Sequence, residues 1–129
     1  MTVAPVQDGQ LRFTLIAVRS GIQYMFGSHA EFDPKGEFAR IRVIVENVDR
    51  SHHELDTSNQ LLVTGTGKTY APREEAMLIA RQPTQVEIGA NNRLEFDIWY
   101  DVPVHSTLQG VRFFGDPASA QGVPVPIPR

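Results

Sequence analysis

The chain has 129 residues, of which 41% are hydrophobic and 21% charged, and its formal net charge is -3. This length fits one compact domain, and the composition is too apolar for a disordered chain. The small acidic excess argues against a basic surface for nucleic acid. The absence of cysteine excludes disulfides, thiolate nucleophiles and iron–sulfur sites. We therefore expect a single domain over residues 1–129, with no nucleic-acid partner and no cofactor.

No stretch approaches the roughly 18 apolar residues that span a bilayer, and no export signal is visible at the start. Residues 1–9 fit either a native start or a chain from which a leader was removed. Arg outnumbers Lys 10 to 2, a skew that GC-rich codon usage often produces and that favours a bacterial source.

Apolar and polar residues alternate with the two-residue period of β-strands along much of the chain. The clearest cases are residues 38–47 and 93–102, each with one apolar and one polar face; Trp99 falls on the polar face. In chain order we predict strands over residues 11–18, around 22–25, over 38–47, at each end of 55–63, and over 68–70, 85–88, 93–102 and 108–114.

Turn residues fill the segments between these strands. The longest predicted loop is residues 19–37, where glycines and an Asp-Pro pair break the alternation. Gly65-Thr66-Gly67 predicts a short hairpin whose turn needs a positive φ. Residues 72–81 predict one short helix, with Pro early, Glu in the first turn and Arg at the end. Four prolines in the tail, residues 116–129, exclude a central strand and leave an edge segment or a disordered end.

About seven or eight short strands and one helix favour an all-β fold, an antiparallel β-sandwich, because each strand has a single apolar face to bury. A small β-barrel is the alternative way to close such a sheet. We expect the core to lie within about residues 8–115.

Four segments carry a family resemblance through their order. An opening strand over residues 8–13 is followed by residues 36–48, which end in Val-x-Asn-Val, by a hairpin within 56–70, and by residues 96–103, which end in Asp-Val-Pro. In this order they resemble the DUF4352 family of immunoglobulin-like domains. One departure is the turn at residues 89–92, where relatives often have Pro-Gly.

The resemblance implies an immunoglobulin-like sandwich that is secreted or displayed outside the membrane. In the second case a lipid anchor, as in a lipoprotein, or a transmembrane helix would hold it. It points to actinobacteria and other Gram-positive bacteria, and it brings no catalytic residues.

The densest group of potential metal ligands is His52-His53-Glu54-x-Asp56, because imidazole and carboxylate groups bind zinc-like ions. The metal candidates are His52, His53 and Asp56. Side chains of adjacent residues diverge in an extended chain, so a solvated loop is the better-supported interpretation. His29 and His105 could join this group only through tertiary folding.

Asp33, Glu95, Asp97 and Asp101 are the candidates for a general acid and base. Such a pair needs two carboxylates a few ångströms apart whose surroundings separate their pKa values. The last three lie on the outward face of one predicted strand, which favours solvation. The chain has no Gly-x-Ser-x-Gly motif, and residues 65–69 lack the spacing of a phosphate-binding loop. We therefore predict no catalytic residues.

Three aromatic residues are candidates for partner binding. Tyr24 and Phe26 lie in the longest predicted loop, and Trp99 lies on the polar face of its strand. Exposed aromatic rings anchor protein partners or stack on sugars. The alternative is that Tyr24 and Phe26 cap one end of the sandwich, while the helix or the tail covers Trp99, since large aromatics are mostly buried.

Together these features predict a non-catalytic, extracytoplasmic binding module for a protein, glycan or lipid partner at the cell envelope. One alternative is a small secreted protein that binds a ligand or metal through its histidine-bearing loops. A second alternative is a hydrolase of cell-envelope polymers. Open sheet edges would also permit a homodimer.

Overall fold

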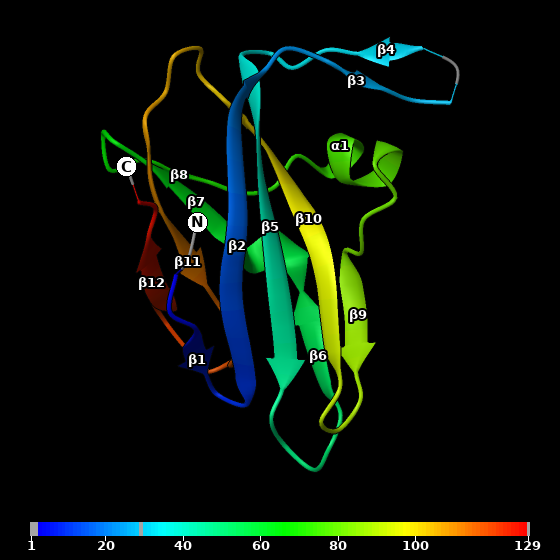
Figure 1. Ribbon diagram of the computed structural model, residues 1–129, viewed down its shortest axis with the longest axis vertical. Helices are drawn as coiled ribbons and strands as arrows, with labels where there is room; N and C mark the ends of the chain where they lie inside the picture. The colour runs from blue at the N-terminus through cyan, green and yellow to red at the C-terminus, as the bar shows by residue number, and fades with distance from the viewer. Residues whose placement is uncertain (1–2, 29, 129) are drawn as a thin grey trace.

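The computed structural model describes residues 3–28 and 30–128. Figure 1 shows three long strands, β2, β5 and β10, side by side, with shorter strands around them and α1 to one side. In chain order the elements are β1 (Val6–Asp8), β2 (Leu11–Ile22), β3 (Met25–Phe26), β4 (Glu31–Phe32), β5 (Glu37–Asn47), β6 (His53–Asp56), the 3₁₀-helix η1 (Thr57–Asn59), β7 (Leu61–Thr64), β8 (Thr69–Tyr70), α1 (Glu74–Ile79), β9 (Gln85–Ile88), β10 (Arg93–Val102), β11 (Leu108–Phe113) and β12 (Val123–Pro126).

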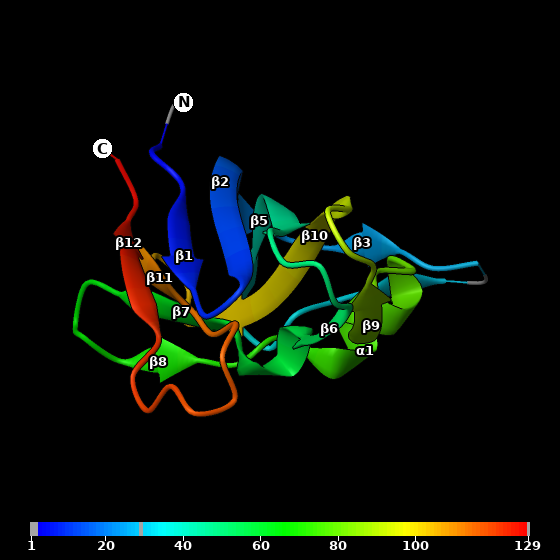
Figure 2. The same cartoon turned by 90° about the horizontal axis from the view of Figure 1, so that it is seen from below.

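The chain forms an immunoglobulin-like β-sandwich. One sheet has the strand order β1-β2-β5-β10 and the other β12-β11-β7-β8, and Figure 2 shows them as separate layers. Two-stranded ribbons, β3–β4 and β6–β9, complete the described strands. The layers meet through apolar side chains: Phe13 of β2 stacks on Phe113 of β11, with ring centroids 4.7 Å apart. The predicted sandwich is confirmed.

The strands with the strongest alternation match their predicted bounds. Residues 93–102 form β10, and residues 37–47 form β5. The two strands pair antiparallel, with Phe96 opposite Val43 and Ile98 opposite Ile41. All four side chains are buried, because the apolar faces of both strands point into the core.

The predicted hairpin and helix are also present. Gly67 has φ +84° in the turn between β7 and β8, a backbone conformation that residues with a side chain rarely adopt. The helix α1 is shorter than predicted, and it buries Ala76 and Met77. Within residues 3–28 and 30–128, no helix has the length and apolar content needed to cross a bilayer.

The predicted long loop over residues 19–37 is partly wrong. β2 continues to Ile22, with register shifts against β5, and β3 and β4 form a small hairpin inside the loop. A further strand, β1, pairs with β2 across the turn at Gly9. β3 and β4 have two residues each and β1 has three. Such elements are too short for an alternating pattern, so periodicity does not reveal them.

The proline-rich tail supplies an edge strand. β12 pairs with β11, and Ile127 extends the ladder by donating its N–H to the carbonyl of Gln109 (2.9 Å). Odd-numbered residues of this segment therefore bond to β11, while Pro124 and Pro126 occupy the outward-facing positions. Val125 is buried, so the core extends beyond the expected residues 8–115. Prolines are tolerated here because edge strands need no donor on their outer side.

A buried glutamine connects the two sheets. Gln60 is 1% exposed; its Nε2 donates to the carbonyls of Asp56 (3.0 Å) and Phe114 (2.9 Å), and its Oε1 accepts from the N–H of Phe114 (2.7 Å). The hydroxyl of Tyr100 donates to the Gln60 carbonyl (2.9 Å). Burial raises the pKa of Tyr100, which keeps this hydroxyl protonated as a donor. Since Tyr100 belongs to β10 and Gln60 adjoins β7, the Tyr100 bond joins the layers, while the side-chain bonds tie Gln60 to Asp56 of β6 and to Phe114, just after β11 of its own sheet.

Replacing Gln60 should therefore destabilise the fold. Gln60→Ala leaves the Phe114 N–H and two carbonyls without their partner and opens a cavity, so we expect unfolding free energy to fall by about 2–4 kcal/mol. Urea denaturation measures the change. The matched control is Gln109→Ala, on the exposed side of β11, expected within about 0.5 kcal/mol of the unmodified chain. Equal effects of both substitutions would contradict this role.

Candidate functional site

The β3–β4 hairpin is fixed to the sandwich by buried and half-buried side chains. Met25 is buried, and Phe32 stacks on Phe38 of β5 with ring centroids 5.9 Å apart. The guanidinium of Arg73 lies 5.1 Å from the centroid of the Phe32 ring, within cation–π range. The hairpin therefore has a firm base, although each strand is only two residues long.

Asp101 holds the segment that follows β4. Its carboxylate accepts from the backbone N–H groups of Lys35 (2.7 Å) and Gly36 (3.0 Å) and from Arg73 Nη1 (2.5 Å). A Cβ at Gly36 would lie 2.1 Å from the carbonyl oxygen of Val102, so only glycine allows this close approach. The Asp-Val-Pro motif thus has a structural role: its Asp fixes the loop beside the hairpin.

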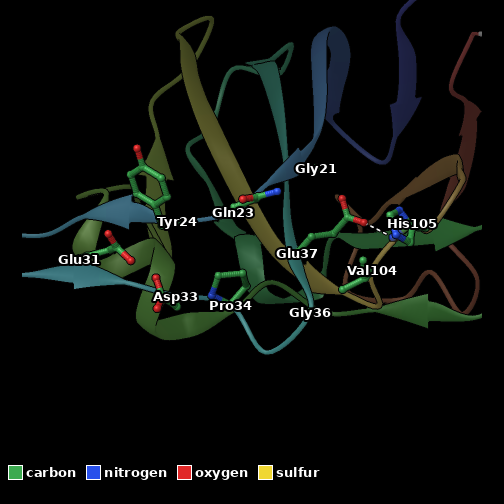
Figure 3. A pocket seen from close by; sticks show the side chains of 10 residues that line it. All are labelled: Gly21, Gln23, Tyr24, Glu31, Asp33, Pro34, Gly36, Glu37, Val104 and His105. Carbon is green, nitrogen blue, oxygen red and sulfur yellow. Dashed lines mark hydrogen bonds between the residues drawn. The ribbon is translucent and has the colours of Figure 1, made fainter.

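A cleft of about 540 Å³ opens between this hairpin and the loop joining β10 to β11. Figure 3 shows Tyr24, Glu31 and Asp33 on one side of it and Glu37 with His105 on the other. Glu37 accepts a hydrogen bond from the backbone N–H of His105. The volume is typical of small-ligand sites. The residues lining the cleft are Gly21, Gln23, Tyr24, Glu31, Asp33, Pro34, Gly36, Glu37, Val104 and His105.

Exposed apolar side chains lie in the cleft and on the β3–β4 hairpin beside it. Phe26 is 72% exposed and Tyr24 47% exposed, and their rings meet edge to face at 5.2 Å. The remaining large exposed hydrophobics of residues 3–28 and 30–128 are Val104, which lines the cleft, and Leu78 of α1. Figure 1 shows α1 beside the β3–β4 hairpin. Tyr24 and Phe26 do not cap the sandwich, because both rings are exposed, whereas Met25 is buried and Phe32 packs on Phe38.

Trp99 is not available to a partner. It is 8% exposed, packs edge-on against Phe38 at 5.7 Å, and lies under the guanidinium of Arg40 at 5.6 Å. Its backbone N–H donates to Met77 Sδ of α1 (3.3 Å). Trp99 is therefore wrong as a partner-binding candidate, and the alternative that the helix covers it agrees with the structure. The tail does not contribute to this cover, since β12 edges the other sheet.

The candidate metal ligands are not brought together, which agrees with the preferred interpretation of this segment as a solvated loop. His53 Nε2 lies 2.8 Å from Asp49 Oδ2, whereas His52 Nε2 lies 3.6 Å from Glu87 Oε1. Asp56 accepts from the N–H and hydroxyl of Ser58 at the start of η1. In the part of the chain that the structure describes, no three His, Asp or Glu side chains are placed to hold a metal ion. His29 lies outside the described residues.

The acidic candidates divide between ion pairs and the cleft. Glu95 and Asp97 pair with Arg42 at 2.6 and 3.0 Å on the outer face of the sheet. Asp33 lies in the cleft with Glu31, whose pKa is raised by a side-chain hydrogen bond to Asp33 and by its negative charge. Sequence reasoning missed Glu31 and Glu37, because nothing in their spacing marks a cleft that two distant loops form.

Asp101 should control the order of the loop beside the cleft. In Asp101→Ala, the N–H groups of Lys35 and Gly36 lose a charged acceptor, so we expect their amide exchange to accelerate at least about tenfold. Hydrogen exchange followed by NMR measures this. Asp97→Ala is the control, because it removes a carboxylate of the same strand that pairs with Arg42. Unchanged exchange at both amides in Asp101→Ala would contradict the assignment.

Asp49 should titrate below the ordinary range. The His53 hydrogen bond, followed by that from the Arg50 N–H, lowers the pKa of Asp49. Its contribution to stability is therefore present above the unfolded pKa and is lost as pH falls through the lower, folded pKa. We expect His53→Ala to raise the pKa of Asp49 in an NMR titration of its carboxyl carbon. The carboxyl carbon of Asp116, followed in the same titration, is the control. An unchanged pKa of Asp49 in His53→Ala would refute the coupling.

Comparison with known proteins places the chain in a family. The model of DUF4352, a domain of unknown function, matches residues 4–123. The chain is similar to the secreted protein MPT63 of Mycobacterium tuberculosis, with a TM-score of 0.70 and 15% identity over 98% of this chain and 92% of that one. It is also similar to the yjhA protein of Bacillus subtilis, with a TM-score of 0.63 and 17% identity over 91% and 85%.

No curated protein sequence matches significantly. At these identities the two structures establish the shared fold. The family match spans nearly the whole chain, which is therefore a member of the DUF4352 family.

Proposed function

We propose that this chain is a non-catalytic binding module that acts outside the bacterial cytoplasm and meets its partner with the β3–β4 end. The observation that carries the proposal is the gathering of exposed apolar side chains there, with Phe26 72% exposed. Water-exposed apolar groups of this size are typical of interaction surfaces. The base of the hairpin is held by Phe32, Arg73 and Asp101, so little order has to be gained on binding.

Location outside the cytoplasm is supported by the secreted M. tuberculosis relative. The geometry suits attachment to a surface as well. Figure 2 depicts β1 and β12 together at one side of the molecule, with the β3–β4 hairpin at the far side. A chain held at either end would therefore present the hairpin away from its anchor.

A hydrolase of cell-envelope polymers is the alternative that the Glu31 and Asp33 pair raises. In glycosidases the two carboxyl groups are about 5–9.5 Å apart, to flank the bond that breaks. Glu31 and Asp33 both lie exposed at the rim of the cleft, where neither carboxyl group is shielded from water. That arrangement favours binding over acid–base chemistry.

The apolar tip should be required for partner binding. Phe26→Ser removes the most exposed aromatic ring without touching the core, and we expect it to reduce retention of the chain on its binding component at least about tenfold. Purified chain is applied separately to envelope proteins, cell-wall sacculi and phospholipid vesicles of the source bacterium. Sedimentation or surface plasmon resonance then measures retention in each arm.

The control is Gln109→Ser, an exposed substitution on the other sheet, which should bind normally. Equal binding by Phe26→Ser and the unmodified chain, or no retention in any arm, would refute the proposal. Release of soluble fragments from sacculi, lost in Glu31→Gln, would establish the hydrolase instead.

A further inference from the structure

The cleft carries an excess of negative charge. Glu31, Asp33 and Glu37 line it, and no Lys or Arg is among the described residues that do. Five carboxylates elsewhere are paired with arginine: Glu46 with Arg12, Glu95 and Asp97 with Arg42, and Asp101 and Glu75 with Arg73. Within residues 3–28 and 30–128, the three cleft carboxylates make no such ion pair. The cleft therefore gathers three acidic groups that make no ion pair with a basic side chain of the described residues.

Glu37 is the most informative of the three, because it is buried. It is 9% exposed, and its Oε1 accepts from the backbone N–H of His105. Its Oε2 faces the bare backbone of Gly21, where a Cβ would lie 3.3 Å away, and it accepts no hydrogen bond from the described residues. A buried carboxylate is expensive unless it is paired. A glutamine at position 37 would accept the hydrogen bond from the His105 N–H equally well, so this bond does not explain why the residue is charged.

Glu31 and Asp33 repeat the pattern at the rim. Both side chains line the cleft, and a hydrogen bond to Asp33, followed by the negative charge of Asp33, raises the pKa of Glu31. Neighbouring carboxyl groups repel each other when both are ionised. A cation placed beside them would relieve that repulsion.

The remaining lining favours an organic cation over a metal ion. Tyr24 contributes a ring that is 47% exposed, and aromatic faces attract ammonium and guanidinium groups. The described residues hold no group of three ligands placed for a metal. The volume of about 540 Å³ exceeds what a bare ion needs, and the carboxylates lie on both sides of the cleft. A ligand with more than one cationic centre would therefore fit best.

We propose that the cleft between the β3–β4 hairpin and the β10–β11 loop binds an organic cation, a polyamine or the basic side chains of a peptide, through Glu31, Asp33, Glu37 and Tyr24. This inference deepens the proposed function, on which it rests, by naming the chemistry that the β3–β4 end recognises. Glu37 would supply the buried counter-charge, Glu31 and Asp33 the charge at the rim, and Tyr24 the aromatic wall.

The test is an NMR titration of the ¹⁵N-labelled full chain at low salt with spermidine and with n-butylammonium. We expect shifts at the amides of Gly21, Gly36 and His105, with dissociation constants of about 1–10 mM for n-butylammonium and about tenfold tighter binding for spermidine. The neutral molecule 1-pentanol, of similar shape to n-butylammonium, should give no saturable shifts there. The combined variant Glu31→Gln and Asp33→Asn should weaken spermidine binding about tenfold, and both sites are exposed, so folding is retained.

Two further variants sharpen the test. Glu37→Gln keeps an acceptor for the His105 N–H while removing the buried charge, and it should also weaken binding. Glu54→Gln, an exposed acid on β6 far from the lining residues in sequence, is the matched control and should bind as the unmodified chain does. Equal shifts with 1-pentanol, or full affinity in the combined variant, would overturn the proposal. Saturable amide shifts with MgCl₂, together with no binding of spermidine, would overturn it as well.

A final arm separates the sources of the cation. The peptide Gly-Lys-Lys-Gly binding more tightly than spermidine assigns the cleft to a basic segment of a protein, and the reverse order assigns it to a free polyamine; both support the proposal. If the cleft binds none of these cations but Phe26-dependent retention on an envelope component is observed, this inference is wrong and the proposed function stands. Cation binding without any such retention would refute the proposed function and leave a small-ligand site.

Discussion

The sandwich depends on one buried amide. Two sheets that meet only through apolar contacts can slide, because hydrophobic contacts have no direction. Gln60 supplies directional bonds between the segment before β7 and the end of β11, and its carbonyl receives the Tyr100 hydroxyl from the opposite sheet. Both N–H donors and the oxygen of its side-chain amide are used with partners from the chain. The Tyr100 bond between the layers therefore ends on a segment that these side-chain bonds hold in place.

The sequence predicted those parts of the fold that repeat with a period. β5 and β10 are long enough for alternation to fix their faces, and Gly67 marks a turn by its conformation. Trp99 is an exception to the expectation that the outer face of β10 is exposed, because Phe38 and Arg40 cover this face near α1. Alternation reports which residues share a face, but it does not report what later packs on that face.

The candidate site was only half visible for a different reason. Tyr24, Phe26 and Asp33 were candidates because of their residue types and their place in a long predicted loop, whereas Glu31 and Glu37 were not candidates. A cleft is made by segments that meet in space, here near residues 21–37 and 104–105, and no local pattern encodes that meeting. The metal candidates illustrate the same point: His52 and His53 are adjacent in the chain, but their side chains lie near different carboxylates.

The two prolines of β12 have a consequence for how copies of this chain behave at high concentration. Pro124 and Pro126 take the outward-facing positions of an edge strand, where other residues would offer N–H groups to a passing strand. An incoming backbone meets carbonyl oxygens without the donors that would complete a ladder. This edge of the sheet therefore does not favour the strand addition by which fibrils grow. That is a useful property for a protein whose other end exposes aromatic side chains to water.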